Sequence, residues 1–167
     1  TMGVFSARSS LHALMPPVVP LHGGISMFSQ SGNVGVQMLY WGNNKGIGYD
    51  KFVSSGNEGD LKCEDYLAYF AEDPDTKVIL AYLEGLDPDS RLYQVARQVC
   101  RRKPVLIFKG GRTQTGGKAA ASHSGAMAVS SRVLRAAFRQ AGIIELEDSQ
   151  GLTDCAKAFS TYPIPHG

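Results

Sequence analysis

A single histidine lies within a long loop of glycines, small residues and hydroxyls. The loop runs over residues 110–126 and contains His123. Histidine has the side-chain pKa nearest to neutrality, so a neutral ring nitrogen is available for nucleophilic attack at physiological pH. The glycines leave an open approach to that nitrogen, and their backbone N–H groups can stabilise an anion. The loop therefore indicates nucleophilic chemistry at His123, provided that the fold supplies its partners.

A carboxylate at the end of an apolar run is one candidate partner. Glu84 directly follows the run 78–83. Burying an unpaired carboxylate is costly, so this side chain must reach solvent, a cation or a histidine. As a functional group it would accept a hydrogen bond from one imidazole nitrogen of His123 and leave the other free to attack. As a structural residue it would simply be exposed where the strand ends, and the residue type alone leaves both interpretations open.

Two further loops follow expected strands. The motif Ser31-Gly32-Asn33 comes after the strand expected at 25–28 and precedes a helix. A helix N-terminus with small residues binds anions, and an ordinary tight turn with a serine cap is the equally weighted alternative. Gly56 and Asn57 come after the strand expected at 49–54 and are candidates for the wall of the same pocket.

Five strands alternate with five helices along the sequence. Short apolar runs predict strands at 25–28, 49–54, 78–83, 105–108 and 143–146. Helical periodicity predicts helices that end near Asn43, near Glu72, before Pro104, at Ala141 and before Pro163, the second of them capped by Asp60. Such alternation is typical of a parallel sheet with helices on both faces.

We therefore expect a flavodoxin-like α/β fold, a three-layer sandwich with a five-stranded parallel sheet in the order 2-1-3-4-5. In that order the first, third and fourth strands are neighbours, and ligands bind beyond the carboxyl ends of the strands. His123, Glu84 and the motif Ser31-Gly32-Asn33 would then meet at one edge of the sheet. Residues 1–22 contain three prolines and are expected to form an irregular lead-in segment.

Length and composition exclude several classes of protein. With 167 residues, of which 43% are hydrophobic and 19% charged, the chain fits one globular domain. Its longest apolar runs are too short to cross a bilayer and no secretory signal is visible, so no membrane contact is expected. The net charge is only +2, and neither a Walker-type nor a G-x-G-x-x-G phosphate-binding motif occurs.

Cysteine usage favours a cytoplasmic location. Cys63, Cys100 and Cys155 show no C-x-x-C spacing and lie at apolar positions of expected helices. This pattern predicts buried reduced thiols rather than disulfides, metal ligands or a nucleophile. The cations at 97–103 are interpreted as a solvated helix face near a C-terminus, and no contact with nucleic acid is expected.

A series of ordered motifs resembles a known enzyme family. The motifs lie at residues 29–33, 46–48, 52–58, 72–78, 83–85, 109–112, 121–126 and 137–142. Together they resemble the central flavodoxin-like region of the NDP-forming acyl-CoA synthetases, over roughly residues 23–162. This family includes ADP-forming acetyl-CoA synthetase and is related to the succinyl-CoA synthetase alpha subunit.

The resemblance implies a reaction and a role for each site residue. Acyl-CoA, ADP and phosphate interconvert with the free acid, ATP and CoA, through an acyl phosphate and a transient phosphohistidine. His123 matches the phosphorylated histidine, and Glu84 matches the carboxylate that stabilises it. The remaining candidates are Ser31, Gly32, Asn33, Ser122 and Gly125 for phosphate binding and Gly56 and Asn57 for the substrate pocket.

The resemblance also implies partners that this sequence does not contain. The N-terminal CoA-binding domain and the ATP-grasp domain of the family are absent, residues 1–22 resemble the connector from the former, and 23–167 form the flavodoxin-like domain. CoA and ATP or ADP with Mg²⁺ would be bound mainly by those domains or subunits, and no metal is expected here. We expect this chain to be an incomplete catalyst within a larger, oligomeric ligase that meets a small carboxylic acid and phosphate.

Two other function classes remain as alternatives. A non-catalytic acyl-CoA-sensing domain, like the ligase-like region fused to some protein lysine acetyltransferases, would share the fold but would not need His123. A flavodoxin-type FMN protein would share the fold class, but the long histidine loop has no role in it.

Overall fold

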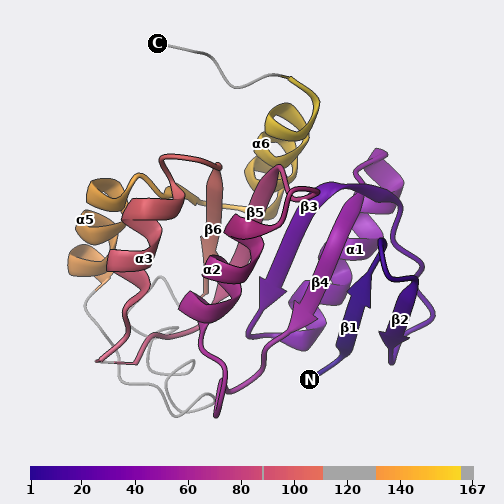
Figure 1. The fold of residues 1–167 in the computed structure, drawn as a ribbon, viewed down its shortest axis with the longest axis horizontal. Helices are drawn as coiled ribbons and strands as arrows, with labels where there is room; N and C mark the ends of the chain where they lie inside the picture. The colour runs from indigo at the N-terminus through magenta and orange to yellow at the C-terminus, as the bar shows by residue number, and fades with distance from the viewer. Residues whose placement is uncertain (88, 111–130, 163–167) are drawn as a thin grey trace.

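The computed structural model describes residues 1–87, 89–110 and 131–162, and it shows one seven-stranded sheet between two layers of helices (Figure 1). The strands are β1 (Gly3–Ser6), β2 (Leu11–Leu14), β3 (His22–Ser29), β4 (Tyr49–Ser54), β5 (Val78–Leu83), β6 (Val105–Lys109) and β7 (Ile144–Leu146). Their order across the sheet is β2-β1-β4-β3-β5-β6-β7. The strands β4, β3, β5, β6 and β7, in this spatial order, are parallel to one another. They correspond to the five predicted strands and confirm the predicted order 2-1-3-4-5.

The prediction of a five-stranded sheet was wrong, because the first residues of the chain are not irregular. β1 and β2 form an antiparallel hairpin, and β1 pairs antiparallel with β4, where Phe5 lies opposite Phe52. Phe5 is only 5% exposed, so the hairpin adds to the core. The prolines that suggested an irregular segment all follow β2, and a proline removes only the strand pairing at its own position.

Helices cover both faces of the sheet. Those on one face are α1 (Gly32–Lys45) and α6 (Ser149–Thr161), and those on the other are α2 (Cys63–Glu72), α3 (Leu92–Val99) and α5 (Ser131–Ala141). Side chains alternate between the faces along each strand. Ile79 therefore packs in the core beneath α2, α3 and α5, and its neighbour Leu80 packs in the core beneath α1 and α6. The predicted three-layer sandwich is confirmed.

A glycine lets helix α1 approach the sheet closely. A Cβ atom on Gly35 would lie 2.7 Å from the ring of Phe52 and 2.9 Å from the Cβ of Ser29. These separations are shorter than van der Waals contact, so a larger residue would push the helix away from the sheet. The close approach holds the first turn of α1 beside the ends of β3 and β4.

Helix α2 begins at Cys63 and not near Asp60, where the sequence predicted its cap. Asp65 in the first turn accepts a hydrogen bond from the N–H of Lys62 (2.9 Å), and an acidic side chain is favoured at a helix N-terminus. The loop between β4 and α2 is therefore longer than expected. The predicted end of the helix, at Glu72, is confirmed.

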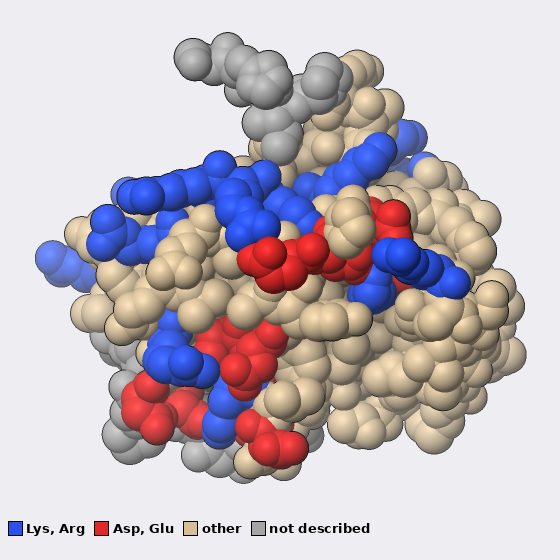
Figure 2. Space-filling model, in the orientation of Figure 1, with Lys and Arg blue, Asp and Glu red and all other residues tan. Residues whose placement is uncertain are grey.

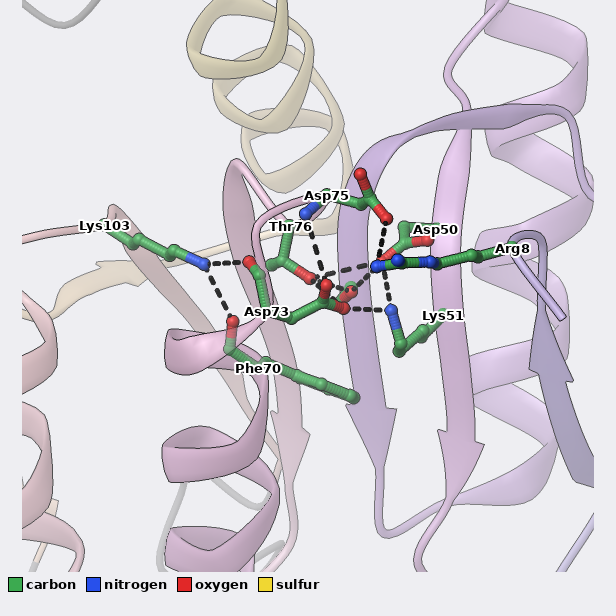
Figure 3. A network of polar contacts seen from close by, with 9 residues as sticks. Arg8, Asp50, Lys51, Phe70, Asp73, Asp75, Thr76 and Lys103 are labelled. Atoms are coloured by element: carbon green, nitrogen blue, oxygen red, sulfur yellow. Dashed lines mark hydrogen bonds and ion pairs between the residues drawn. The ribbon is translucent and has the colours of Figure 1, made fainter.

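A buried cluster of charged and hydroxyl side chains ties the strands together near the start of β5 (Figure 3). The Lys51 ammonium contacts the carboxylates of Asp50 (2.5 Å) and Asp73. The Thr76 hydroxyl donates to Asp50 (3.3 Å) and lies 2.6 Å from the hydroxyl of Ser26. These contacts join β3 and β4 to the connection between α2 and β5.

The cations that follow α3 do not form a uniform basic surface. Arg102 pairs with Glu72 (2.6 Å), and Lys103 donates to the backbone carbonyls of Phe70 (3.0 Å) and Asp73 (2.5 Å), as Figure 3 shows. Lys103 therefore caps the C-terminus of α2, and the prediction that it is a solvated side chain was wrong. Figure 2 shows acidic side chains interleaved with Lys and Arg on this face.

The sequence predicted buried, reduced cysteines and no membrane-spanning segment. The three cysteines are free thiols, as predicted, but only Cys63 is buried; Cys100 and Cys155 are partly exposed. Cys100 follows the last residue of α3 and still packs against the core. Among the described residues, no helix is both long enough and apolar enough to cross a membrane.

Candidate functional site

The carboxyl ends of three neighbouring strands bring predicted site residues to one edge of the sheet. Ser29, the last residue of β3, pairs with residues at the ends of both β4 and β5. Adjacent strands lie about 4.8 Å apart, so the loops that follow them are neighbours. These loops hold the motif Ser31-Gly32-Asn33, the pair Gly56-Asn57 and Glu84.

The first turn of α1 presents backbone donors at this edge. The Ser31 hydroxyl accepts from the N–H of Val34 (3.4 Å), and the Ser31 carbonyl accepts from the N–H of Gly35 (3.0 Å). The N–H groups of Gly32 and Asn33 precede the first bonded turn, where the helix dipole also favours negative charge. This arrangement suits the oxygens of a small anion.

The first residues of the chain border the same turn. The N–H of Met2 donates to the hydroxyl of Ser54 (2.9 Å). A Cβ on Gly32 would lie 2.5 Å from the Cγ of Met2, and a Cβ on Gly56 would lie 2.9 Å from the Cγ2 of Thr1. Because β1 is antiparallel to β4, the chain begins where β4 ends, and its first residues form one wall of the site.

Glu84 lies half-buried just beyond β5. Its N–H donates to the Oε1 of Gln30 (2.6 Å), and its carbonyl accepts from the Nζ of Lys109 (2.5 Å). Burial raises the pKa of the Tyr82 hydroxyl, and the negative charge of Glu84 adds to that rise. The hydrogen bonds to Gln30 and Lys109 fix the backbone on both sides of the Glu84 Cα.

The predicted nucleophile His123 lies outside the described residues, as do Ser122 and Gly125. The chain reaches that stretch through Gly110, whose N–H donates to the carbonyl of Leu83 (2.8 Å). Gly110, the last described residue before that stretch, therefore lies next to the end of β5.

A cavity of about 290 Å³ opens between the loops that follow β4 and β5. This volume is at the lower end of the range for ligand pockets, about 300 Å³ and above, and suits a small molecule. Gly56 and Asn57 line it, but Glu84 and the motif Ser31-Gly32-Asn33 are not among its described lining residues. The lining residues are Gln30, Gly56, Asn57, Glu58, Lys62, Cys63, Glu64, Gly85, Leu86, Asp87, Asp89, Ser90 and Arg91.

Glu58 is a buried carboxylate of this cavity that the sequence reasoning missed. It is 8% exposed, and it accepts from the hydroxyl of Ser55 (2.8 Å) and the N–H of Cys63 (3.0 Å). Burial raises the pKa of Glu58, although these hydrogen bonds and one from Gln30 oppose the rise. Its φ of +53° lies in the left-handed region, and such strain is typical of functional sites. The signal in the sequence was a carboxylate inside a polar loop after a strand.

Glu64 and Cys63 lie at the start of α2 and complete the acidic side of the cavity. Glu64 is 4% exposed, and it accepts from the hydroxyl of Ser90 (3.0 Å) and the N–H of Arg91 (2.9 Å). Burial alone would raise the pKa of Glu64, but hydrogen bonds, above all the one from Arg91, lower it. Burial raises the pKa of the Cys63 thiol, so this sulfur stays protonated at neutral pH and does not act as a nucleophile.

A magnesium site does not form in the described part of the chain. No group of three His, Cys, Asp or Glu side chains there is placed to hold a metal ion.

Sequence comparisons with known proteins agree on one family. The family described as succinyl-CoA ligase like flavodoxin domain matches residues 22–159. The chain is 40% identical over 161 residues to ADP-forming acetate–CoA ligase I of Archaeoglobus fulgidus, which covers 96% of this chain and 24% of that protein. It is 38% identical over 165 residues to the alpha subunit of ADP-forming acetate–CoA ligase I of Pyrococcus furiosus, which covers 99% of this chain and 36% of that subunit.

A solved structure extends the similarity to the whole described fold. The dinucleotide forming acetyl-coenzyme A synthetase 1 of Ca. Korarchaeum cryptofilum, in complex with phosphate and ADP, superposes with a TM-score of 0.94. It is 39% identical, and the match covers 99% of this chain and 36% of that chain. The chain thus spans between 24% and 36% of the length of these relatives.

Proposed function

Because the chain belongs to the family of succinyl-CoA ligase like flavodoxin domains, we propose that it carries the phosphohistidine step of an ADP-forming acyl-CoA ligase. The resemblance drawn from the ordered motifs is confirmed by relatives that are ADP-forming acetate–CoA ligases. In this proposal His123 is the residue that is phosphorylated, and Glu84 is its carboxylate partner.

The reaction consists of three transfers. A phosphate oxygen attacks the carbonyl carbon of the acyl-CoA thioester, the C–S bond breaks, and CoA leaves as the acyl phosphate forms. A ring nitrogen of His123 then attacks the phosphorus, the P–O bond to the acyl group breaks, and the free carboxylate leaves. Finally an oxygen of the ADP β-phosphate attacks the same phosphorus, the P–N bond breaks, and ATP forms. In sum, acyl-CoA, ADP and phosphate give the acid, ATP and CoA.

Glu84 and the α1 N-terminus would assist the histidine in different ways. The Glu84 carboxylate accepts a hydrogen bond from one ring N–H of His123, so the other nitrogen is the nucleophile. The same contact stabilises the positive charge that the ring gains when it is phosphorylated. Ser31, Gly32 and Asn33 receive the phosphoryl oxygens at the positive end of the helix dipole.

The observation that carries the proposal is the convergence at one edge of the sheet. Glu84 and the first turn of α1 lie beyond the carboxyl ends of adjacent strands, and Gly110, which precedes the loop with His123 in the sequence, bonds to the end of β5. Each feature alone has a structural explanation, but a carboxylate, anion-binding amides and a histidine together suit phosphoryl transfer. A phosphate-handling role is also supported by the related synthetase that was solved with phosphate and ADP.

We assign the acyl group to the cavity lined by Gly56, Asn57 and Glu58. Its volume of about 290 Å³ admits a small carboxylic acid, and Gly85, the residue after Glu84, is one of its lining residues. Ser122 and Gly125 would complete the phosphate contacts from the histidine loop.

Other domains or subunits would supply the rest of the catalyst. The chain spans only 24% to 36% of its relatives, so CoA would bind mainly to a CoA-binding domain, and ADP with Mg²⁺ to an ATP-grasp domain. Residues 1–22 would follow the former in the sequence, but they add the β1–β2 hairpin to the sheet of this domain and are not only a connector. The assembled ligase would be a cytoplasmic oligomer.

Phosphate labelling of the full-length protein tests the proposal. With ATP radiolabelled at the γ-phosphate, the wild type should acquire acid-labile, base-stable phosphate, and His123→Ala should acquire none. His12→Ala is the matched control, because His12 is an exposed histidine away from this edge. Label that persists undiminished in His123→Ala would refute the assignment. A protein that binds acyl-CoA but takes no label would instead support the sensing alternative.

A further inference from the structure

The side chain of Gln30 extends the ladder between β3 and β5 beyond the last residues of these strands. The backbone N–H of Gln30 donates to the carbonyl of Tyr82 (3.1 Å). Its Oε1 accepts from the N–H groups of Glu84 (2.6 Å) and Gly85 (3.1 Å), and its Nε2 donates to the carbonyl of Gly85 (3.1 Å). The side-chain amide thus acts as an additional peptide group of the sheet and holds three backbone groups of one turn.

Lys109 holds the same turn from the opposite side. It pairs with Leu83 at the end of β6, and its Nζ donates to the carbonyls of Glu84 (2.5 Å) and Gly110 (2.6 Å). Burial lowers the pKa of Lys109, and the charge of Glu84 opposes that change. Gly110, which follows Lys109, packs closely against the neighbouring strand, because a Cβ there would lie 2.4 Å from the hydroxyl of Tyr82.

We propose that Gln30 and Lys109 are positioning residues that fix the Glu84–Gly85 turn, and through it the Glu84 carboxylate, for phosphoryl transfer at His123. The inference rests on the proposed function of Glu84. The Glu84 N–H belongs to the peptide plane before its Cα, and the Glu84 carbonyl belongs to the plane after it. Gln30 holds the first plane and Lys109 holds the second. With both planes held, only side-chain rotamers remain to direct the carboxylate.

Methionine substitutions remove these hydrogen bonds and keep the length of the side chains. Gln30→Met is preferred to Gln30→Glu, because a second carboxylate would repel the buried Glu58, which Gln30 already contacts. Lys109→Met removes both donated bonds, and Lys109→Arg retains donors for the two carbonyls. Gln37→Met replaces an exposed glutamine of α1 and is the matched control.

The rate of His123 labelling in a single turnover, together with kcat and KM for the acid, tests the proposal in the full-length protein. A misplacement of about 1 Å costs on the order of 100-fold in rate. We therefore expect Gln30→Met and Lys109→Met each to slow labelling by about 10- to 100-fold, with KM changed by less than about threefold. Lys109→Arg should recover most of the rate, and Gln37→Met should match the wild type.

A double-mutant comparison shows whether Gln30 acts through Glu84. In a Glu84→Gln background, adding Gln30→Met should slow labelling by less than about threefold, because the group being positioned is already lost. Equal slowing in both backgrounds, or wild-type labelling in both methionine variants, would overturn the positioning role and leave the phosphohistidine intact. An unlabelled wild type would overturn the proposed function itself. Thermal unfolding identifies a poorly folded Gln30→Met protein, in which case Lys109→Met and its recovery by Lys109→Arg decide the question.

Discussion

Replacement of Lys51 by methionine should reverse the pH dependence that the buried charge cluster gives to folding stability. The Lys51 ammonium contacts both Asp50 and Asp73, and the side chains of Lys51 and Asp73 are only 11% and 8% exposed. Without the cation, two carboxylates would remain close together in a poorly hydrated site. Thr76 would still donate a hydrogen bond, and the charge of Lys103 would still act on Asp73, but the cation that contacts both carboxylates would be gone.

The pKa of Asp73 gives the magnitude in the wild type. Burial alone would raise this pKa, but hydrogen bonds, the first of them from Lys51, lower it from 3.8 to about 2. A carboxyl group with a lowered pKa stabilises the fold above its unfolded-state pKa, and this contribution is lost as the pH falls through the folded-state value. The difference corresponds to about 2 kcal/mol at 1.36 kcal/mol per pKa unit. The free energy of unfolding should therefore decline by about 2 kcal/mol between about pH 5 and pH 2.

In Lys51→Met the sign should change. Removing one partner of a buried ion pair costs about 3–5 kcal/mol at neutral pH. Burial and repulsion by the neighbouring carboxylate would raise the pKa of Asp73, so this variant should be most stable below about pH 4 and lose stability as the pH rises. Urea unfolding followed by circular dichroism across that range measures both profiles. Lys45→Met, at an exposed lysine of α1, is the control and should keep the wild-type profile.

Parallel pH profiles for Lys51→Met and the wild type would contradict this reasoning, because the carboxylates would then not depend on the cation. A loss of the same size at every pH would assign the contribution of Lys51 to packing of its aliphatic stem. Only a loss that grows with pH agrees with the charge cluster shown in Figure 3.

Three further outcomes are expected. Phe70→Ala removes a fully buried side chain and should cost about 3–5 kcal/mol in urea unfolding, whereas Tyr69→Ala, at a side chain 62% exposed, should cost about 0.5 kcal/mol or less. Burial raises the pKa of Glu58, so its ionisation lowers the stability of the fold as the pH rises. Glu58→Gln should therefore be more stable than the wild type at pH 7 but not at about pH 4. An equal difference in unfolding free energy at both pH values would refute this. Cys155, which is partly exposed, should react with a thiol reagent in the folded protein, and Cys63 only after unfolding.

The parallel part of the sheet could be predicted from the sequence because its signals are local. The run 78–83 is buried on both faces, so it shows a continuous apolar pattern that marks a central strand. The hairpin was missed because its place depends on a distant partner: Phe5 becomes a core residue only by pairing with Phe52. A four-residue strand carries too little periodicity to indicate such a partner.

Within the candidate site, too, some residues could be predicted from the sequence and others could not. Glu84 and the motif Ser31-Gly32-Asn33 could be predicted because a rule about strand ends placed them together. Gln30 and Lys109 could not, because they bond to backbone N–H and carbonyl groups, which every turn possesses. Which side chain meets these groups depends on the arrangement of three strand ends in space.

Because β1 runs antiparallel to β4, the first residues of the domain lie at the carboxyl ends of the parallel strands. Any residues joined ahead of Thr1 start within contact distance of Gly56, which lines the cavity. Helix α6 ends at the opposite end of the sheet, as Figure 1 shows. A ligand tethered by a short flexible linker before Thr1 would reach an effective concentration on the order of millimolar at the site. The N-terminal junction is thus the place from which a covalently attached group can be delivered to the cavity.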